Sequence, residues 1–348
     1  MTDLERAGVA LCDWFDGHMR PLPWRENREP YRIWVSEVML QQTRVETVIG
    51  YFERFMARFP TVQALAAAQR DEVLKLWEGL GYYRRAEYLL KGAQYIVTQL
   101  DGAFPRSAGE LERIPGIGAY TAGAIASMAF GERVAAVDGN VLRVTARLAA
   151  YRDPVNLPEA RAKAGKISLA MMPEGRVWSH TQAMMELGAC ICLPRNPHCT
   201  LCPVQDACRA FEQGLERSLP VKGARKKQLE VQRDVYMITD GRHMLLRRRP
   251  DEGLLRGMWE FPGEEADTGF LAGFTVRRRE KAVPARHVFT HRIWQMQGWW
   301  IEVAPCAAPE GCCWADEKKL AALALPSAMA SFRNYALARL GCGNPSGK

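Results

Sequence analysis

The sequence has no apolar run of the roughly 18 residues that a membrane-spanning helix needs, so we expect no membrane segment. The first residues, 1–6, include early acidic side chains and lack the basic and apolar regions of an ordinary secretory signal. Internal repeats and low-complexity tracts are also missing, and 48% of the residues are hydrophobic, which argues against overall disorder. These absences favour a globular cytoplasmic protein.

The chain has 348 residues, enough for two domains of ordinary size. Its 47 Lys and Arg residues outnumber 39 Asp and Glu residues, which gives a formal net charge of +8. A basic soluble chain often binds a polyanion, so nucleic acid is a candidate partner. Ten cysteines in a reducing compartment favour a metal site over a disulfide framework.

Residues 1–211 carry helical periodicity and almost no strand-like alternation, which predicts an all-α domain. Apolar residues at helical spacing predict helices over 31–49, 73–77, 88–100, 121–129 and 141–150. Glycines after the second of these ranges should end that helix.

The pattern changes after residue 211. Residues 212–231 are basic, contain Pro and Gly, and are expected to form a linker. Beyond them, 232–348 should form an α+β domain. The expected strands lie at 231–239, 243–248, 288–297 and 299–303, and 320–340 should be partly helical.

Four cysteines lie within 17 residues, at Cys192, Cys199, Cys202 and Cys208. The spacing C-x6-C-x2-C-x5-C has one C-x2-C knuckle, whereas a zinc ribbon usually has two. Four thiolates also satisfy a [4Fe–4S] cluster. The spacing alone leaves iron–sulfur and zinc open. Cys190, just before the group, is interpreted as a buried small hydrophobic residue.

A hairpin motif lies at 111–122, where Gly116 and Gly118 follow the end of one helix and precede the next. Two glycines let the backbone approach a ligand, and N–H groups at a helix N-terminus suit a phosphate. Downstream, Asp138 and Asn140 stand at a glycine-containing break before another helix. By itself, Asp138 would be interpreted as a helix N-cap.

In this order, the hairpin, Asp138 and the four cysteines resemble the helix–hairpin–helix DNA glycosylase superfamily. In that resemblance the cysteine spacing is that of a [4Fe–4S] cluster. The endonuclease III-like branch carries a lysine nucleophile in the hairpin, where this chain has Tyr120. This difference favours the branch of MutY-type adenine glycosylases. Four further stretches also resemble that branch, at 22–24, 34–43, 79–83 and 182–188. The resemblance covers about residues 5–211 and continues more weakly beyond.

The resemblance implies that an adenine is flipped out of the duplex and released by cleavage of its N-glycosidic bond. Neutral adenine is a poor leaving group, so an acid must protonate it, and a carboxylate must stabilise the cationic sugar. Glu37, on an apolar helix, matches the family's proton donor, and burial there would raise its pKa. Asp138 should stabilise the cation, while Asn140 and Tyr120 order the water and the carboxylates.

The other expected site residues follow from the same resemblance. The base pocket should consist of Leu22, Trp24, Arg25, Leu40, Gln182 and Met185. The DNA contacts should come from Gln41, Gln42, Thr43, Leu80, Tyr82, Gly116, Gly118, His287, Phe289, Thr290 and His291. Among these, Gln42, Leu80 and Tyr82 match the family's wedge positions, whose side chains fill the hole left by an extruded base. Tyr83 is expected in the core.

The second domain resembles a Nudix (MutT-like) fold around 257–263. The G-x5-E-x7-R-E-U-x-E-E box that binds Mg²⁺ in working Nudix hydrolases is missing, so we expect a domain that no longer hydrolyses nucleotides. In the resembling family this domain recognises 8-oxoguanine opposite adenine through Phe-Ser-His. Here Thr290 replaces the serine and retains the hydroxyl.

The sequence thus predicts a monofunctional glycosylase that excises adenine opposite 8-oxoguanine or guanine. The expected partner is double-stranded DNA containing that mispair, and we expect a nucleoid-associated monomer. A bifunctional glycosylase–lyase for oxidised pyrimidines is the alternative, disfavoured by Tyr120. A non-catalytic mispair-binding module is a third hypothesis, disfavoured by the presence of Glu37 and Asp138. A nucleotide hydrolase is disfavoured by the missing Nudix box.

Overall fold

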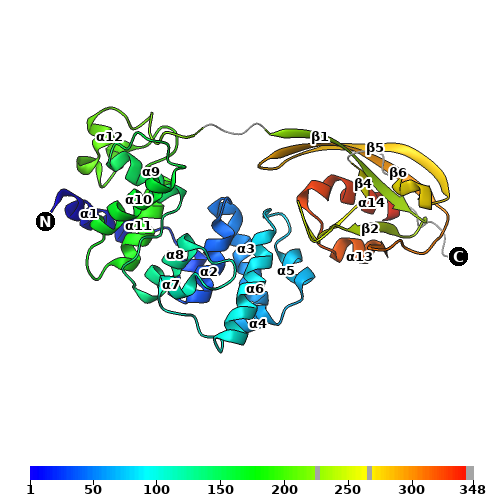
Figure 1. The fold of residues 1–348 in the computed structure, drawn as a ribbon, viewed down its shortest axis with the longest axis horizontal. Helices are drawn as coiled ribbons and strands as arrows, with labels where there is room; N and C mark the ends of the chain where they lie inside the picture. The colour runs from blue at the N-terminus through cyan, green and yellow to red at the C-terminus, as the bar shows by residue number, and fades with distance from the viewer. Residues whose placement is uncertain (224–227, 265–268, 342–348) are drawn as a thin grey trace. The chain divides into compact units, whose positions relative to one another are not determined.

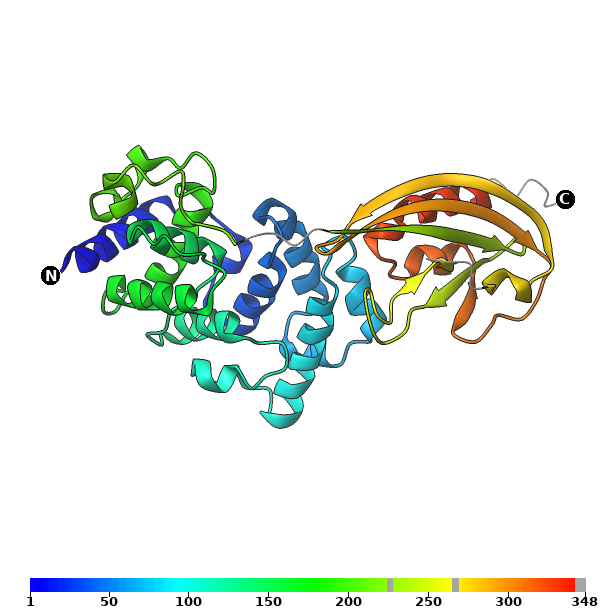
Figure 2. The same ribbon diagram turned by 45° about the horizontal axis from the view of Figure 1, so that its top comes forward.

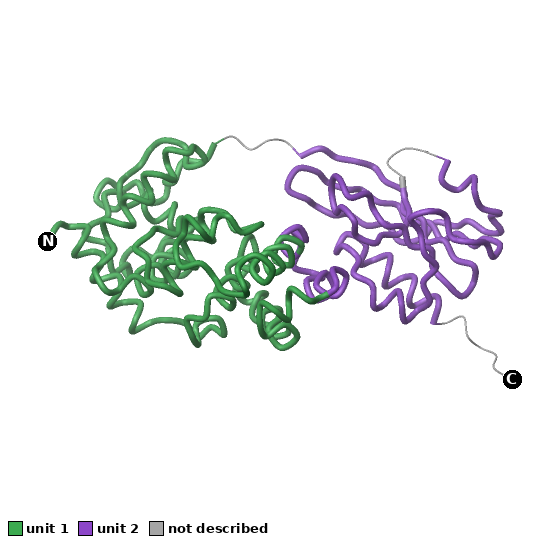
Figure 3. The backbone as a smooth tube through the Cα atoms, turned by 60° about the horizontal axis from the view of Figure 1, so that its bottom comes forward, with its two compact units in different colours: residues 1–68, 87–224 green, residues 69–86, 225–348 purple. Residues whose placement is uncertain are grey.

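A computed structural model describes residues 1–223, 228–264 and 269–341. The chain forms two compact units, coloured separately in Figure 3. The first contains residues 1–68 and 87–224, and the second contains 69–86 and 225–348. The basic stretch expected as a linker at 212–231 is therefore divided between the units. Because Leu219 is buried and the amide of Val155 donates to the carbonyl of Val221 at 3.0 Å, the first unit extends beyond the expected boundary at 211.

The first unit is all-α, as the sequence predicts. Its helices are α1 (Asp3–His18), α2 (Pro30–Leu40), α3 (Val45–Arg58), α4 (Val62–Ala66), most of α6 (Arg84–Gln99), α7 (Ala108–Leu111), α8 (Ala119–Phe130), α9 (Gly139–Leu148), α10 (Pro158–Met171), α11 (Val177–Cys190) and α12 (Arg209–Glu212), with 3-10 turns η1 (Pro23–Arg25), η2 (Cys199–Leu201) and η3 (Gln205–Ala207). Helices α1, α9, α10 and α11 pack against one another, and α2 packs on α8 (Figure 1). Among the described residues, no helix has both the length and the apolarity to cross a bilayer.

Helix α2 ends earlier than the apolar pattern over 31–49 predicts. The Glu29 side chain caps its first turn, with Pro30 at the first helical position. The helix stops at Leu40 because the next residue, Gln41, has a ψ of 112°, outside the right-handed helical region, and Gln42 follows with a φ of 58°. A second helix, α3, starts at Val45, so the predicted single helix is wrong and a non-helical corner separates two helices.

A close approach between helices positions the start of α9. A Cβ at Gly188 of α11 would lie only 2.5 Å from the Cβ of Asn140. Glycine at this position therefore allows α11 to pass directly behind the first turn of α9. This contact places the Asp138 cap of α9 beside the inner face of α11.

The second unit is built on one curved sheet. Its strands are β1 (Leu229–Thr239), β2 (Met244–Arg248), β3 (Trp259–Glu260), β4 (Gly263–Glu264), β5 (Val276–Val288), β6 (Arg292–Val303) and β7 (Cys312–Ala315). The order along the sheet is β3-β2-β1-β6-β5, with β4 paired to β1 and β7 paired to β2. Strands β1 and β6 run parallel from the pair Leu229 and Arg292 to the pair Thr239 and Glu302. The long β5–β6 hairpin curves over the C-terminal helix (Figure 2).

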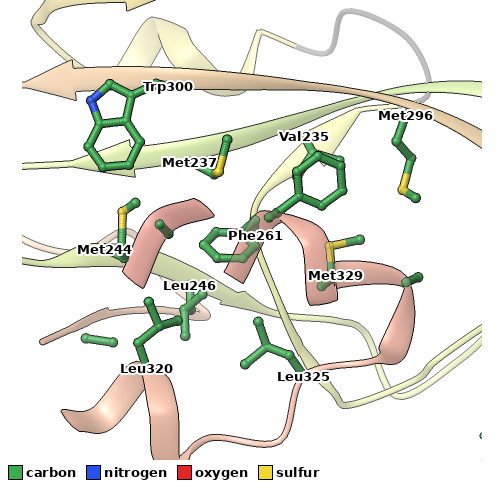
Figure 4. Close-up of a cluster of buried hydrophobic side chains, with 14 of the residues drawn as sticks. Val235, Met237, Met244, Leu246, Phe261, Met296, Trp300, Leu320, Leu325 and Met329 are labelled. Carbon is green, nitrogen blue, oxygen red and sulfur yellow. The ribbon is translucent and has the colours of Figure 1, made fainter. Parts of the chain in front are cut away.

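The remaining elements of this unit are α5 (Arg70–Leu76), η4 (Phe270–Gly273), α13 (Glu317–Ala322), η5 (Ser327–Met329) and α14 (Ala330–Gly341). One face of the sheet buries Val235, Met237 and Trp300 against Leu320 and Met329 of the helical layer (Figure 4). The opposite face carries a smaller apolar cluster that includes Tyr236 and Ile301. These two layers confirm the predicted α+β domain.

The strand predictions in this unit are partly wrong. Strands at 231–239 and 243–248 match β1 and β2 closely. The predicted strand at 288–297 instead crosses the turn between β5 and β6, and β6 continues through 299–303 without a break. Strand β5 went unpredicted because it contains many charged residues and Pro284, which suit an edge strand with one exposed face.

Candidate active site

A cleft of about 480 Å³ lies in the first unit, within the size range of ligand pockets. It gathers the four predicted catalytic residues, Glu37, Tyr120, Asp138 and Asn140. Every predicted base-pocket residue also lines it: Leu22, Trp24, Arg25, Leu40, Gln182 and Met185. These residues come from the 22–25 turn, α2, α8, the start of α9 and α11, so the fold brings together sequence segments far apart.

Glu37 lies on the inner face of α2, and only 5% of its surface is exposed. Burial raises the pKa of Glu37 to about 7, and the nearby negative charge of Asp138 adds to the effect. The Tyr120 hydroxyl donates a hydrogen bond to one carboxylate oxygen and partly opposes this rise. The glutamate can therefore hold a proton near neutral pH, as a general acid requires.

Asp138 is the N-cap of α9. Its Oδ1 accepts a hydrogen bond of 2.7 Å from the amide of Val141, and its Oδ2 accepts one of 2.8 Å from Asn140 Nδ2. Burial raises the pKa of the Asp138 carboxyl, although these hydrogen bonds favour its charged form. The structural and the chemical interpretations of Asp138 are therefore compatible. The cap fixes the orientation of the carboxylate while it lines the cleft.

Arg143 connects this carboxylate to the cysteine loop, a connection that sequence reasoning missed. Its Nη2 donates to Asn140 Oδ1 at 2.9 Å and to the Gly188 carbonyl at 2.7 Å. Its Nε donates to the Cys192 carbonyl at 2.8 Å. The spacing from Asn140 to Arg143 is one helical turn, which was the available signal for the first contact.

A buried charge network orients the polar side of the cleft. Glu186, on α11, binds Arg20 through hydrogen bonds of 2.6 and 2.9 Å and Arg25 through one of 2.8 Å. Arg25 Nε in turn donates to Gln182 Oε1 at 2.8 Å, which leaves the amide nitrogen of Gln182 available to a ligand. Sequence reasoning missed Arg20 and Glu186. Glu186 follows Gln182 by four residues on one helix, and this spacing could have indicated that both side chains lie on the same face.

The four predicted metal-ligating cysteines lie in the loop between α11 and α12 and are partly buried. Burial raises the pKa values of Cys199, Cys202 and Cys208, and their neighbouring thiols contribute to the rise. Arg147 Nη1 donates to Cys192 Sγ at 3.1 Å. Within the described ranges, no three His, Cys, Asp or Glu side chains converge closely enough to hold a single metal ion. Four cysteine thiolates in one loop are nevertheless a donor set that a [4Fe–4S] cluster accepts.

The predicted hairpin lies at the N-terminus of α8. Gly116 has a φ of 86°, and a Cβ there would lie 2.5 Å from the Cβ of Tyr88, so glycine is required for both reasons. Gly118 is the exposed N-cap of α8, with open space around its Cα. The turn therefore presents unblocked backbone at a helix N-terminus, a geometry that suits a phosphate.

The corner between α2 and α3 forms part of the rim of the cleft. Gln41, Gln42 and Thr43 all line it. Gln42 is exposed, and its positive φ of 58° holds it in a conformation that non-glycine residues rarely adopt. Gln41 Nε2 donates to Thr121 Oγ1 at 3.4 Å, which joins this corner to α8.

The remaining predicted DNA contacts belong to the second unit. Tyr82 is 48% exposed, whereas Leu80 is buried, as is Tyr83. The Tyr82 hydroxyl lies 3.2 Å from Thr290 Oγ1 in the β5–β6 turn. In that turn, Thr290 and His291 are exposed. The Phe289 ring makes edge-on contacts with the rings of His287 and Trp294. Of the three predicted wedge side chains, the structure thus exposes two, those of Gln42 and Tyr82.

Comparisons with known proteins agree with this geometry. Residues 35–166 match the model of the HhH-GPD superfamily of base excision DNA repair proteins, and residues 234–334 match a NUDIX domain. These matches confirm the predicted assignment of both folds. The chain also resembles a thermostable thymine-DNA glycosylase, with a TM-score of 0.54 and 26% identity over 61% of this chain and 97% of that one. An endonuclease III in a non-covalent DNA complex has a TM-score of 0.51 and 25% identity, covering 62% of this chain and all of the other.

Curated relatives extend the similarity into the second unit. An adenine DNA glycosylase from Mus musculus is 34% identical over 93% of this chain and 77% of its own length. Those from Arabidopsis thaliana and Homo sapiens are 39% and 37% identical over 83% and 72% of this chain. The chain spans 56% of the length of each of these two relatives.

Proposed function

Because the chain belongs to the adenine DNA glycosylase family, we propose that it is a monofunctional enzyme that excises adenine opposite 8-oxoguanine or guanine in double-stranded DNA. The observation that carries the proposal is the pairing of a buried glutamate, whose pKa is about 7, with Asp138 in one cleft. A carboxylic acid and a carboxylate are the two groups that cleavage of an N-glycosidic bond with a poor leaving group requires.

The cleft suits a flipped purine. The buried side chains of Trp24 and Leu22 form an apolar wall of the cleft, together with Leu40 and Met185. On the polar side, Arg25 fixes the amide of Gln182, so that a donor remains for the edge of the base. An extruded base is typically held by such a combination of apolar faces and hydrogen bonds to its edge.

The chemistry then follows from the two carboxyl groups. Glu37 in its neutral form donates its proton to adenine N7, which turns the base into a better leaving group. As the bond to the sugar breaks, the ionised Asp138, fixed by Val141 and Asn140, stabilises the positive charge on the sugar. Glu37, now ionised, takes a proton from the water that attacks the sugar, and the Tyr120 hydroxyl stabilises that ionised form through its hydrogen bond.

The cleft also supports hydrolysis over strand cleavage. A bifunctional enzyme needs an amine nucleophile near the sugar. Among the described residues that line the cleft there is no lysine, and Tyr120 stands where the bifunctional branch carries one. The sugar should therefore be left intact on the strand as an abasic site.

We expect purified wild-type protein to release adenine from duplexes that pair it with 8-oxoguanine or guanine. The adenine strand should break only after alkali treatment, because hydrolysis leaves an alkali-sensitive abasic site. Single-turnover assays with and without alkali measure this directly. Strand breakage without alkali would instead indicate a lyase, and an intact strand under both conditions would contradict the proposed activity.

We also propose that the four cysteines bind a [4Fe–4S] cluster, which would tie the loop to α9 through Arg147 and Arg143. Purified protein should contain about four iron atoms per chain and absorb visible light. Cys202→Ser should lose most of the iron and lower the melting temperature. Cys190→Ser, two residues outside the group, is the matched control and should keep the iron. One zinc ion per chain in protein produced with excess iron would contradict the cluster.

A further inference from the structure

Residues 69–86 precede the hairpin in sequence but belong to the compact unit of the C-terminal sheet (Figure 3). This segment consists of α5, the loop 79–83 and the first residues of α6. It was predicted as part of the glycosylase domain. Specific contacts hold this segment to the second unit.

Two cations of α5 bind backbone carbonyls of the Nudix-like domain. Arg70 Nη1 donates to the Gly257 carbonyl at 2.8 Å, and its Nη2 donates to the Arg256 carbonyl at 3.3 Å. Lys75 Nζ donates to the Ala321 carbonyl at 2.6 Å. The last of these carbonyls belongs to α13, so the two cations bind α5 to separate parts of the domain.

Two further contacts hold the ends of the loop 79–83. Before the loop, Glu78 forms an ion pair with Arg333 of α14, and their side chains are only 17% and 20% exposed. At the other end, the Tyr83 hydroxyl accepts a hydrogen bond of 3.3 Å from the amide of Ser327 in η5. A charge pair this well shielded from solvent is screened less than a surface pair, so its loss should loosen the attachment of the loop 79–83.

The loop itself is held in an unusual conformation. Tyr82 has a φ of 48°, and its exposed ring lies under the Arg85 guanidinium. Arg85 also donates to the carbonyls of Leu80 and Gly81. Strained backbone of this kind persists only where surrounding contacts over-determine it. Here those contacts bring the Tyr82 hydroxyl to 3.2 Å from Thr290 Oγ1.

We propose that Glu78 and Arg333 are positioning residues that set the preference for 8-oxoguanine over guanine opposite adenine, by holding Tyr82 beside Thr290. This inference rests on the proposed function. An 8-oxoguanine base differs from guanine in carrying a carbonyl at C8 and an N–H at N7. Two adjacent hydroxyl groups offer a donor and an acceptor to that edge only while the loop 79–83 stays fixed to the β5–β6 turn. The chemistry at adenine takes place in the other unit and needs neither residue.

The test compares single-turnover excision of adenine opposite 8-oxoguanine and opposite guanine for wild type, Glu78→Gln, Arg333→Met and the double variant. The ratio of the two rates should fall roughly tenfold in each single variant. Glu78 also pairs with Lys75 at 2.7 Å, so Glu78→Gln breaks two ion pairs and Arg333→Met breaks one of them. The double variant should therefore be no worse than Glu78→Gln alone. Arg333→Lys should recover part of the ratio, since a cation at this position can still reach Glu78.

Arg176→Met is the matched control. It removes two ion pairs within the first unit, to Asp13 and Asp16, whose carboxylates are more exposed than that of Glu78, and its ratio should equal that of wild type. Thermal unfolding identifies any variant that fails to fold, and because two variants break the same pair from opposite sides, one folded variant suffices. A folded variant with an unchanged ratio, or with equal losses on both duplexes, overturns the inference. A wild type that excises adenine but shows no preference overturns the inference and leaves the excision activity standing. A wild type that releases no adenine overturns the proposed function itself.

Discussion

Glu37→Gln is expected to lower the single-turnover rate of adenine excision by about 10³-fold or more, because glutamine has the same shape and cannot donate a proton to the base. The side chain is buried and accepts a hydrogen bond from Tyr120, which the glutamine oxygen can also accept. The variant should therefore fold and still bind the mispaired duplex. Single-turnover kinetics with a binding measurement on the same duplex separates the two effects.

The pH profile gives the same prediction a second test. Excision requires protonated Glu37, and its pKa of about 7 lies well above the ordinary value, so the acid is available up to neutral pH. Above pH 7 the protonated fraction falls about tenfold for each pH unit, and the rate should fall with it. The residual rate of Glu37→Gln should lack this alkaline decline.

Glu29→Gln is the matched control for this variant. It places the same substitution on the same helix, at the exposed N-cap of α2 and outside the cleft. Its rate should remain near wild type. If Glu37→Gln excises adenine as fast as Glu29→Gln, then Glu37 is not the acid and another donor must be sought in the cleft.

Asp138→Asn is expected to reduce excision by a comparable factor, roughly 10³-fold, because it removes the negative charge that stabilises the cationic sugar. Asparagine is as good an N-cap as aspartate, so Oδ1 can still accept from the Val141 amide and α9 should remain intact. The second hydrogen bond is lost, because the NH2 group of the new asparagine would face the NH2 group of Asn140, and both are donors. The rate of excision and the melting temperature are measured together.

The matched control for this variant is Asp316→Asn. Asp316 caps α13 by accepting a hydrogen bond of 2.7 Å from the Lys319 amide, and it does not line the cleft. This variant should keep wild-type excision, which shows that the loss at position 138 is not a general effect of capping. A slow Asp138→Asn variant with a collapsed melting temperature would instead point to a structural role.

Two parts of the candidate site, Asp138 and the hairpin, could be predicted because each belongs to a local motif. Asp138 stands at a glycine-containing helix start, and the hairpin glycines are needed where the chain turns and approaches Tyr88. The resemblance to a family then assigned roles that the residues alone left open. Glu37 by itself would have been interpreted as an ordinary surface glutamate.

The parts that could not be predicted depend on contacts between distant segments. Nothing near Arg20 indicates that it binds Glu186, 166 residues away. The charged edge strand β5 has too little apolar alternation to be recognised, and the break at Gln42 lies inside a continuous apolar pattern. The assignment of 69–86 to the second unit follows from tertiary contacts of Arg70, Lys75 and Glu78. In the sequence these three residues look like ordinary charged surface residues.

The burial of Glu37 also has a consequence for the stability of the fold. Its pKa is about 7 in the folded chain and 4.5 in an unperturbed side chain, so between these values the folded state holds a proton that the unfolded state has released. The free energy of unfolding therefore falls as pH rises from about 4.5 to about 7, and the lost stability is not regained above that range. The residue that serves excision weakens the protein at neutral pH, and the packing around α2 must offset that loss. A lineage released from selection for excision would gain stability by replacing it.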